Sequence, residues 1–160
     1  MNKNTNIYLL SILSLLILSV FAAYIIEYGL GHKPCKLCLY QRYPYYVSIF
    51  LILNILIFKK YIKISLLMLS LVSLIGSTIA FYHFGIEQGF FSESLVCEVN
   101  NLDKNISKED ILKQLSKNII SCKTVTFRVF GLSLASINTI FSILLFGIFL
   151  KLFINYENNK

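Results

Sequence analysis

Four cysteines are the residues of this chain whose type and spacing are best suited to chemistry. They are Cys35, Cys38, Cys97 and Cys122. The first two form a C-x-x-C motif, whereas 24 residues separate Cys97 from Cys122. A disulfide that closes so short a loop rigidifies little chain, and this spacing is common in dithiols that cycle. The motif therefore favours redox catalysis. The spacing of the second pair is compatible with either a redox or a structural disulfide.

Zinc binding and inert disulfide staples are the other uses of four cysteines. Zinc ribbons usually carry two C-x-x-C knuckles, and the second pair is far from that spacing, so we expect no metal site. Two structural disulfides in a non-catalytic scaffold remain the alternative to an enzyme. That alternative predicts that each cysteine replacement lowers stability and that none causes a redox defect.

The residues around the C-x-x-C motif strengthen the redox interpretation. Pro34 suits the start of a helix, and the positive end of the helix dipole favours a thiolate in the first turn. Arg42 lies four residues after Cys38 on the same helical face, where its charge could stabilise a Cys38 thiolate or a reduced electron acceptor. The alternative for Arg42 is an interfacial anchor. His83, near the end of an apolar run, is a further candidate or an ordinary interfacial residue.

The composition points to a bilayer as the solvent. Of 160 residues, 56% are apolar and only 14% are charged, against about 25% charged in soluble domains. The net charge is +7, but the basic residues flank apolar runs instead of forming the patch that nucleic acid binding requires. We therefore expect contact with membrane lipid and none with nucleic acid.

Four apolar runs predict membrane-spanning helices, because a span needs about 20 apolar residues and must satisfy its backbone internally. The second run has 16 residues without a charge, from Tyr43 to Phe58. It becomes long enough if its helix begins upstream, which places Pro44 in the first turns. The first run is longer than the apolar part of a typical signal peptide, so we expect it to be retained. The sequence predicts one all-α domain, residues 1–160, a four-transmembrane-helix bundle with spans at about 7–26, 41–58, 64–84 and 129–150.

The two cysteine pairs fall in the loops at about residues 27–40 and 85–128, on one side of this bundle. The opposite side carries dense lysines on the termini and the short second loop, which favours a cytoplasmic position, although the raw count of basic residues points the other way. Disulfides persist in oxidising compartments, so the cysteines supply an independent argument that these loops lie on the non-cytoplasmic side. Within the long loop, a capping-box pattern from Ser107 to Asp110 predicts a short amphipathic helix, lying on the membrane or packed on the bundle.

The segment Pro34-Cys35-Lys36-Leu37-Cys38-Leu39-Tyr40-Gln41-Arg42 resembles the C-x-L-C-x-x-[QE]-R signature of DsbB-type disulfide-bond-forming membrane proteins. Tyr82-His83 with Glu87-Gln88-Gly89 resembles the close of the family's third span, and Gly131-Leu132-Ser133-Leu134-Ala135 with Asn138 resembles the opening of its fourth. The likeness covers nearly the whole chain. Lys36 and the absence of tryptophan depart from the usual pattern. Reductases of the vitamin K epoxide type share a four-span bundle, but their C-x-x-C lies near the end of the last span.

The resemblance implies a quinone-dependent thiol oxidase in the bacterial inner membrane, with cytoplasmic termini. Such proteins reoxidise a soluble, thioredoxin-fold periplasmic partner of the DsbA type and pass two electrons to a membrane quinone, either ubiquinone or menaquinone. Carried over, Cys97 forms the mixed disulfide with the partner, Cys122 then exchanges with Cys35, and Cys38 contacts the quinone as a thiolate.

The resemblance also implies two residues for the quinone site. Arg42 would stabilise the Cys38 thiolate and the reduced quinone, and His83 would line the site. With the four cysteines, these residues make up the complete set of expected site residues.

Overall fold

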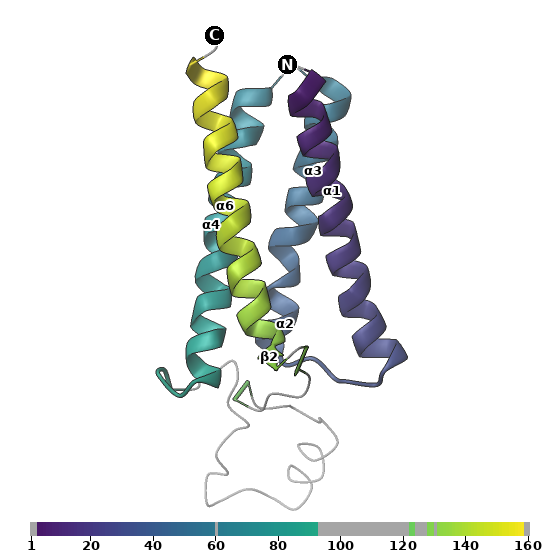
Figure 1. Cartoon of the computed structure of the whole chain (residues 1–160), viewed down its shortest axis with the longest axis vertical. Helices are drawn as coiled ribbons and strands as arrows, with labels where there is room; N and C mark the ends of the chain where they lie inside the picture. The colour runs from purple at the N-terminus through teal and green to yellow at the C-terminus, as the bar shows by residue number, and fades with distance from the viewer. Residues whose placement is uncertain (1–2, 60, 93–121, 124–127, 130, 159–160) are drawn as a thin grey trace, which may run out of the picture.

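The computed structural model describes residues 3–59, 61–92, 122–123, 128–129 and 131–158. Four long helices form a bundle, with both termini at the same end (Figure 1). They are α1 (Lys3–Tyr24), α3 (Arg42–Phe58), α4 (Ile62–Glu87) and α6 (Leu134–Asn158). Each of them overlaps one of the expected apolar runs. Cys97 and the helix expected after Ser107 lie outside the described residues.

Two short elements link α1 to α3. A π-helical turn, η1 (Ile25–Gly29), continues α1, and Gly31 then takes a left-handed φ of 72° that only glycine adopts readily. After this turn the chain returns to the bundle and forms α2 (Lys36–Tyr40), which Gln41 joins directly to α3. Pro44 is the third residue of α3, within the first helical turn, as expected for a residue without an N–H.

The last helix begins later than the sequence suggested. We expected a span from residue 129, but Arg128–Val129 (β1) pairs antiparallel with Leu132–Ser133 (β2). Gly131 makes the turn between them with a φ of 83°. The Ser133 hydroxyl then accepts the backbone N–H of Ser136 at 3.1 Å, which caps the helix. Glycine and cap together set the start of α6 at Leu134, a local effect that hydropathy does not detect.

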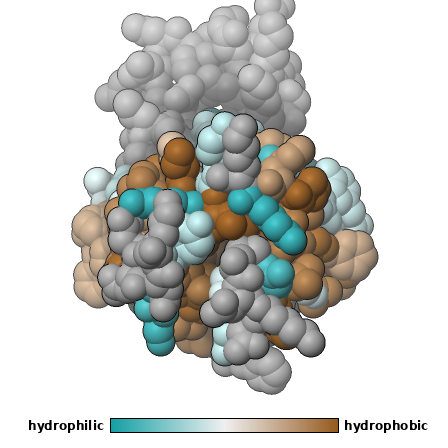
Figure 2. Space-filling model, turned by 90° about the horizontal axis from the view of Figure 1, so that it is seen from above, coloured by the Kyte–Doolittle hydropathy of each residue, from teal (hydrophilic) through white to brown (hydrophobic). Residues whose placement is uncertain are grey.

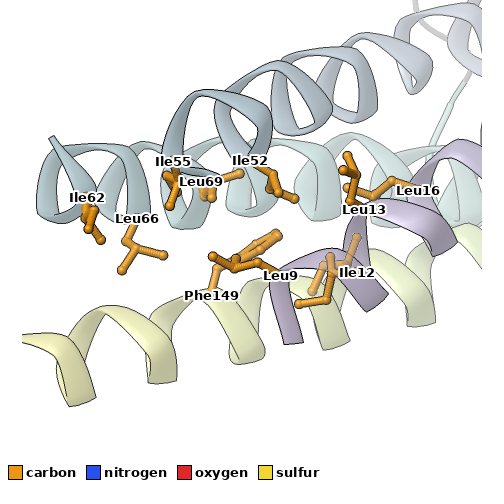
Figure 3. Packing of buried hydrophobic residues seen from close by; sticks show 11 residues of the cluster. Leu9, Ile12, Leu13, Leu16, Ile52, Ile55, Ile62, Leu66, Leu69 and Phe149 are labelled. Atoms are coloured by element: carbon orange, nitrogen blue, oxygen red, sulfur yellow. The ribbon is translucent and has the colours of Figure 1, made fainter. Parts of the chain in front are cut away.

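All four long helices contribute to an apolar core (Figure 3). Leu9 and Leu16 of α1, Ile52 of α3, Leu69 of α4 and Phe149 of α6 are completely buried. These residues lie toward the end of the bundle that carries the termini. The opposite end is held together by a smaller buried cluster that includes Leu37 and Ile86 and by polar contacts.

Small residues bring α4 close to its neighbours. Ser70, Ser73 and Ser77 are buried along α4, and Gly76 lies against Pro44 of α3, where an added Cβ would be only 3.1 Å from the proline Cβ. Small residues at helix contacts are typical of membrane bundles, in which close packing replaces the hydrophobic driving force. The α3–α4 crossing thus depends on the missing side chain of Gly76.

Three helical stretches are long and apolar enough to cross a membrane: Thr5–Gly29, Ile62–Glu87 and Leu134–Tyr156. Their outward faces carry large apolar side chains, and hydrophobic residues dominate the flanks when the bundle is viewed from above (Figure 2). These features indicate a helical membrane protein. Helix α3 has 17 residues, slightly fewer than a span needs, so its role as the fourth span stays a prediction.

Replacing Gly76 with valine should destabilise the bundle by about 1–3 kcal/mol, because the new methyl groups would overlap the rigid Pro44 ring. The matched control is Gly147→Val on α6, where an added Cβ meets nothing within 4 Å. Thermal unfolding in detergent measures both variants. Equal stability of the two would contradict the close α3–α4 packing.

Candidate redox site at the C-x-x-C motif

The C-x-x-C motif lies at the start of α2, as its sequence predicted. Cys35 is the N-cap residue, with an extended backbone, and its sulfur accepts the backbone N–H of Cys38 at 3.2 Å. Cys38 follows one turn later inside the helix, so both sulfurs lie on the same side. The helix start thus supplies a hydrogen bond to one sulfur and aligns the other with it.

The two sulfurs of the motif are 2.7 Å apart, and both cysteines are free. Only a small movement separates this arrangement from a disulfide, in which the sulfurs lie about 2.05 Å apart. Cys35 is buried and Cys38 is half-buried. The pair can therefore pass between dithiol and disulfide without rearrangement of the helix.

Cys122 lies far from the motif in the sequence but belongs to the same site. It is disulfide-bonded and 1% exposed, in a cluster with Cys35, Leu37 and Ile86. The structure thus brings together three of the four expected cysteines, while Cys97 lies outside the described residues. A sulfur of the long loop packs beside the motif, which is the proximity that thiol–disulfide exchange requires.

His83 approaches the motif from α4. Its ring is 3% exposed, and its Nε2 atom lies 3.6 Å from the Cys35 sulfur and 3.8 Å from Glu87 Oε1. His83 was expected from the family resemblance to line a quinone site, which stays a prediction; the structure places its ring beside Cys35. Histidine at this position can donate a hydrogen bond to a Cys35 thiolate.

The two cysteines of the motif differ in pKa. The hydrogen bond from the Cys38 side chain and, against the opposing effect of burial, the hydrogen bond from His83 lower the pKa of Cys35 to about 5. The bond with Cys35, together with burial, raises the pKa of Cys38. The reduced pair therefore loses its first proton from Cys35. The thiolate at Cys38 that the family resemblance implied stays a prediction, because in this structure the hydrogen bond from the Cys38 side chain favours the thiolate on Cys35.

Arg42 does not contact the motif in the way we expected from its spacing. Its guanidinium pairs with Glu27 of η1 at 2.5 Å and lies 5.1 Å from the centroid of the Tyr24 ring. Glu27 was not predicted as the partner of Arg42 from the sequence. Its position could have indicated this role, because Glu27 is the charged residue that ends the first apolar run. A direct effect of Arg42 on a Cys38 thiolate stays a prediction.

A cavity of about 360 Å³ opens beside Cys38, within the range of small-molecule pockets. Helix α1 contributes small residues to its wall, which leave the space open. The cavity is lined by Ser19, Val20, Ala22, Ala23, Ile26, Glu27, His32, Lys33, Pro34, Cys38, Gln41, Arg42, Tyr45, Leu134, Ala135, Ile137, Asn138 and Phe141. Among the described residues, neither Cys35 nor His83 belongs to this lining. The two sulfurs of the motif therefore have different neighbours.

Three polar side chains of the cavity wall were not singled out as site residues from the sequence. Gln41 bonds His83 at 3.0 Å and accepts the Asn138 amide at 2.7 Å, and the Tyr45 hydroxyl donates to Asn138. Gln41 and Asn138 do stand within the segments that resemble the family, which was the available signal. Their mutual contact could not be read from positions 97 residues apart.

A metal ion is the other ligand that the site could suggest. The ligand atoms of Cys35, Cys38 and His83 lie within 4.8 Å of one another. Two thiolates on a tetrahedral zinc ion, with Zn–S distances of about 2.3 Å, stand about 3.8 Å apart. The observed 2.7 Å is too short for that arrangement. The geometry suits sulfur–sulfur bond formation better than metal binding.

Comparison with known proteins agrees with this chemistry. The sequence model of the family described as Disulfide bond formation protein DsbB matches residues 4–152. An uncharacterized protein of Rickettsia prowazekii is 30% identical over 94% of this chain and 89% of its own length. The SPbeta prophage-derived disulfide bond formation protein B of Bacillus subtilis is 33% identical over 80% of this chain and 73% of its own length. No solved structure matches the chain significantly.

In the reduced protein, Cys35 should be alkylated with a midpoint near pH 5. Its lowered pKa keeps the thiolate above that pH, and protonation slows alkylation below it. His83→Gln should move the midpoint upward, because a donor to the thiolate is lost. Mass spectrometry of alkylated peptides, resolved by cysteine, measures both. A midpoint near 8.5, the value of a free cysteine, would contradict the assignment.

Proposed function

The chain belongs to the DsbB family of disulfide bond formation proteins, and on this premise we propose that it is a quinone-dependent protein-disulfide oxidoreductase. It reoxidises a DsbA-type, thioredoxin-fold thiol oxidase and passes the electrons to a membrane quinone. One observation carries the proposal: the Cys35–Cys38 pair has a disulfide-bonded cysteine on one side and an apolar cavity on the other.

The proposed cycle moves one disulfide outward to the soluble partner and two electrons inward to the motif. Cys97 forms the mixed disulfide with the reduced partner, which leaves as a disulfide once its second thiol attacks. The freed Cys122 thiolate then attacks Cys35 of the oxidised motif and releases Cys38. Closure of the Cys97–Cys122 disulfide leaves the motif as a dithiol. Each cycle removes two electrons and two protons from the partner, and oxidation of the dithiol delivers them to the acceptor.

The positions of the described sulfurs support this division of labour. Cys35 shares its buried cluster with Cys122, so it is the sulfur suited to exchange with the loop. Cys38 lines the cavity, so it is the sulfur suited to face an electron acceptor. When Cys35 is bonded to Cys122, Cys38 has been released from the motif disulfide and is the free sulfur at the cavity.

The cavity fits the ring of a quinone. Its walls are mostly apolar, and its polar end carries Cys38, Gln41, Arg42, Tyr45 and Asn138, which can hold ring oxygens in a defined orientation. A bound quinone supplies the capacity to take up two electrons and two protons. Arg42, held in place by Glu27, would face negative charge on the reduced ring. His83 acts on Cys35 in this scheme and does not line the quinone site.

We further propose that the protein spans the bacterial inner membrane four times, with both termini in the cytoplasm. Helix α3, with Gln41 before its 17 residues, forms the fourth span at about 41–58. The termini share one end of the bundle with the α3–α4 connection, and the C-x-x-C motif lies toward the other end (Figure 1). The sulfurs would then face the periplasm, an oxidising compartment.

The competing proposal is a non-catalytic scaffold held by two structural disulfides. The free thiols of Cys35 and Cys38 and the lowered pKa of Cys35 argue against it, because an inert staple needs neither. A reactive thiolate next to a cavity is the arrangement expected of an oxidoreductase.

Cys38→Ser should reduce quinone turnover to the uncatalysed background, because the sulfur that faces the cavity is gone. The assay follows the absorbance of a short-chain ubiquinone or menaquinone analogue in detergent, with dithiothreitol as the donor. Gly147→Ala, on the outer face of α6 away from the site, should keep the activity. Normal turnover by Cys38→Ser would rule out the proposed function.

Ala23→Phe should raise the KM for the quinone analogue about tenfold, because the larger ring fills part of the cavity. Leu18→Phe places the same ring on the same helix at a position that is 58% exposed and should leave KM unchanged. Equal KM values for the two variants would show that the acceptor binds elsewhere.

A further inference from the structure

A chain of side-chain hydrogen bonds runs from Cys35 to Tyr45 through the buried end of the bundle. Cys35 faces His83 of α4, whose Nδ1 atom lies 3.0 Å from the amide nitrogen of Gln41. The Gln41 oxygen accepts from Asn138 of α6, and the Asn138 oxygen accepts from the Tyr45 hydroxyl of α3. His83 is 3% exposed and Gln41 is 7% exposed, so water does not easily replace these bonds.

The hydrogen bonds of this chain all donate in the same direction, from Tyr45 toward His83. The Tyr45 hydroxyl donates to the Asn138 oxygen, so the Asn138 nitrogen is left to donate to Gln41. The Gln41 nitrogen is then left to donate to His83 Nδ1. A neutral imidazole whose Nδ1 accepts carries its proton on Nε2, which is the atom that faces the Cys35 sulfur.

The other groups around the His83 ring favour the same tautomer. The Glu87 carboxylate lies 3.8 Å from Nε2 and also accepts the Ser133 hydroxyl. The Cys35 thiolate and this carboxylate are both acceptors near Nε2. A proton on Nε2 can be donated to one of them, whereas a bare Nε2 would face both with its lone pair.

We propose that Tyr45, Asn138 and Gln41 are positioning residues that hold His83 as the Nε2–H tautomer and thereby keep Cys35 ready as a thiolate. The inference rests on the proposed function, since it assigns these residues to the oxidation of the same dithiol. All three also line the cavity beside Cys38. They therefore connect the cavity wall with the Cys35 sulfur, which lies outside the cavity. They act through His83 and form no bond with Cys35 themselves.

The test compares Tyr45→Phe and Asn138→Leu, each of which breaks the chain without adding a charge. The matched control is Thr139→Val, because Thr139 is buried next to Asn138 in the sequence but its hydroxyl donates to the Ala135 carbonyl of its own helix. Cysteine-resolved alkylation across pH gives the Cys35 midpoint for each reduced variant. We expect both chain variants to shift it upward by about one pH unit, and Thr139→Val to leave it unchanged.

Nitrogen-15 NMR provides a readout that loss of stability does not imitate. The chain has two histidines, so His83→Gln assigns the His83 signals. We expect Nε2–H in the wild-type protein and a mixture of tautomers in Tyr45→Phe and Asn138→Leu. An Nδ1–H wild type, or unshifted midpoints in both variants, would overturn the inference. Neither measurement uses a quinone or a partner protein, so failure of the proposed electron transfer would show separately, in the turnover assay.

Discussion

A sulfur anion in a buried site is the constraint on which this structure depends. Burial alone opposes ionisation, so a reactive Cys35 needs donors that offset the loss of water. It receives one from the backbone of Cys38 because it caps α2, and it faces another on His83. Both donors explain features that hydropathy does not require. The chain forms a short helix before α3, and α4 carries the polar His83 at the close of its apolar run and continues past the run to Glu87.

The same constraint divides the bundle into two parts. The end that carries the termini is packed with large aliphatic side chains from every long helix. The end that carries the motif instead contains buried amides, hydroxyls and charges, each of which has to find a partner. Small residues of α1 leave a cavity there, and the C-x-x-C turn places one sulfur in its wall and the other in the cluster with Cys122. Stability and chemistry are thus assigned to opposite ends of the same helices.

Local signals in the sequence predicted the local features of this molecule. Apolar runs indicated the long helices, and Pro34 with the C-x-x-C motif indicated a helix start at the cysteines. The comparisons confirm the resemblance to the DsbB family. The misplaced start of α6 has a local cause too, but one that hydropathy ignores, namely the turn at Gly131 and the cap at Ser133. Contacts between distant residues were harder to predict. Spacing on one helix suggested that Arg42 serves Cys38, whereas the tertiary structure supplies a stronger partner in Glu27.

The Arg42–Glu27 pair also explains how a charged side chain can stand in an apolar cavity wall. An unpaired guanidinium at this depth would be costly, and a carboxylate at 2.5 Å offsets much of that cost. The pair is close to neutral as a unit, so it does not compete with His83 for the first thiolate of the motif. It still leaves guanidinium N–H groups at the polar end of the cavity, next to the wall that Cys38 shares. In the proposed mechanism, a neutral quinone ring would enter without displacing a free cation, and negative charge that develops on it would meet a donor already held in position. The ion pair and the hydrogen-bonded histidine would then serve different sulfurs of one motif, which would let the two cysteines differ in role although they are only one helical turn apart.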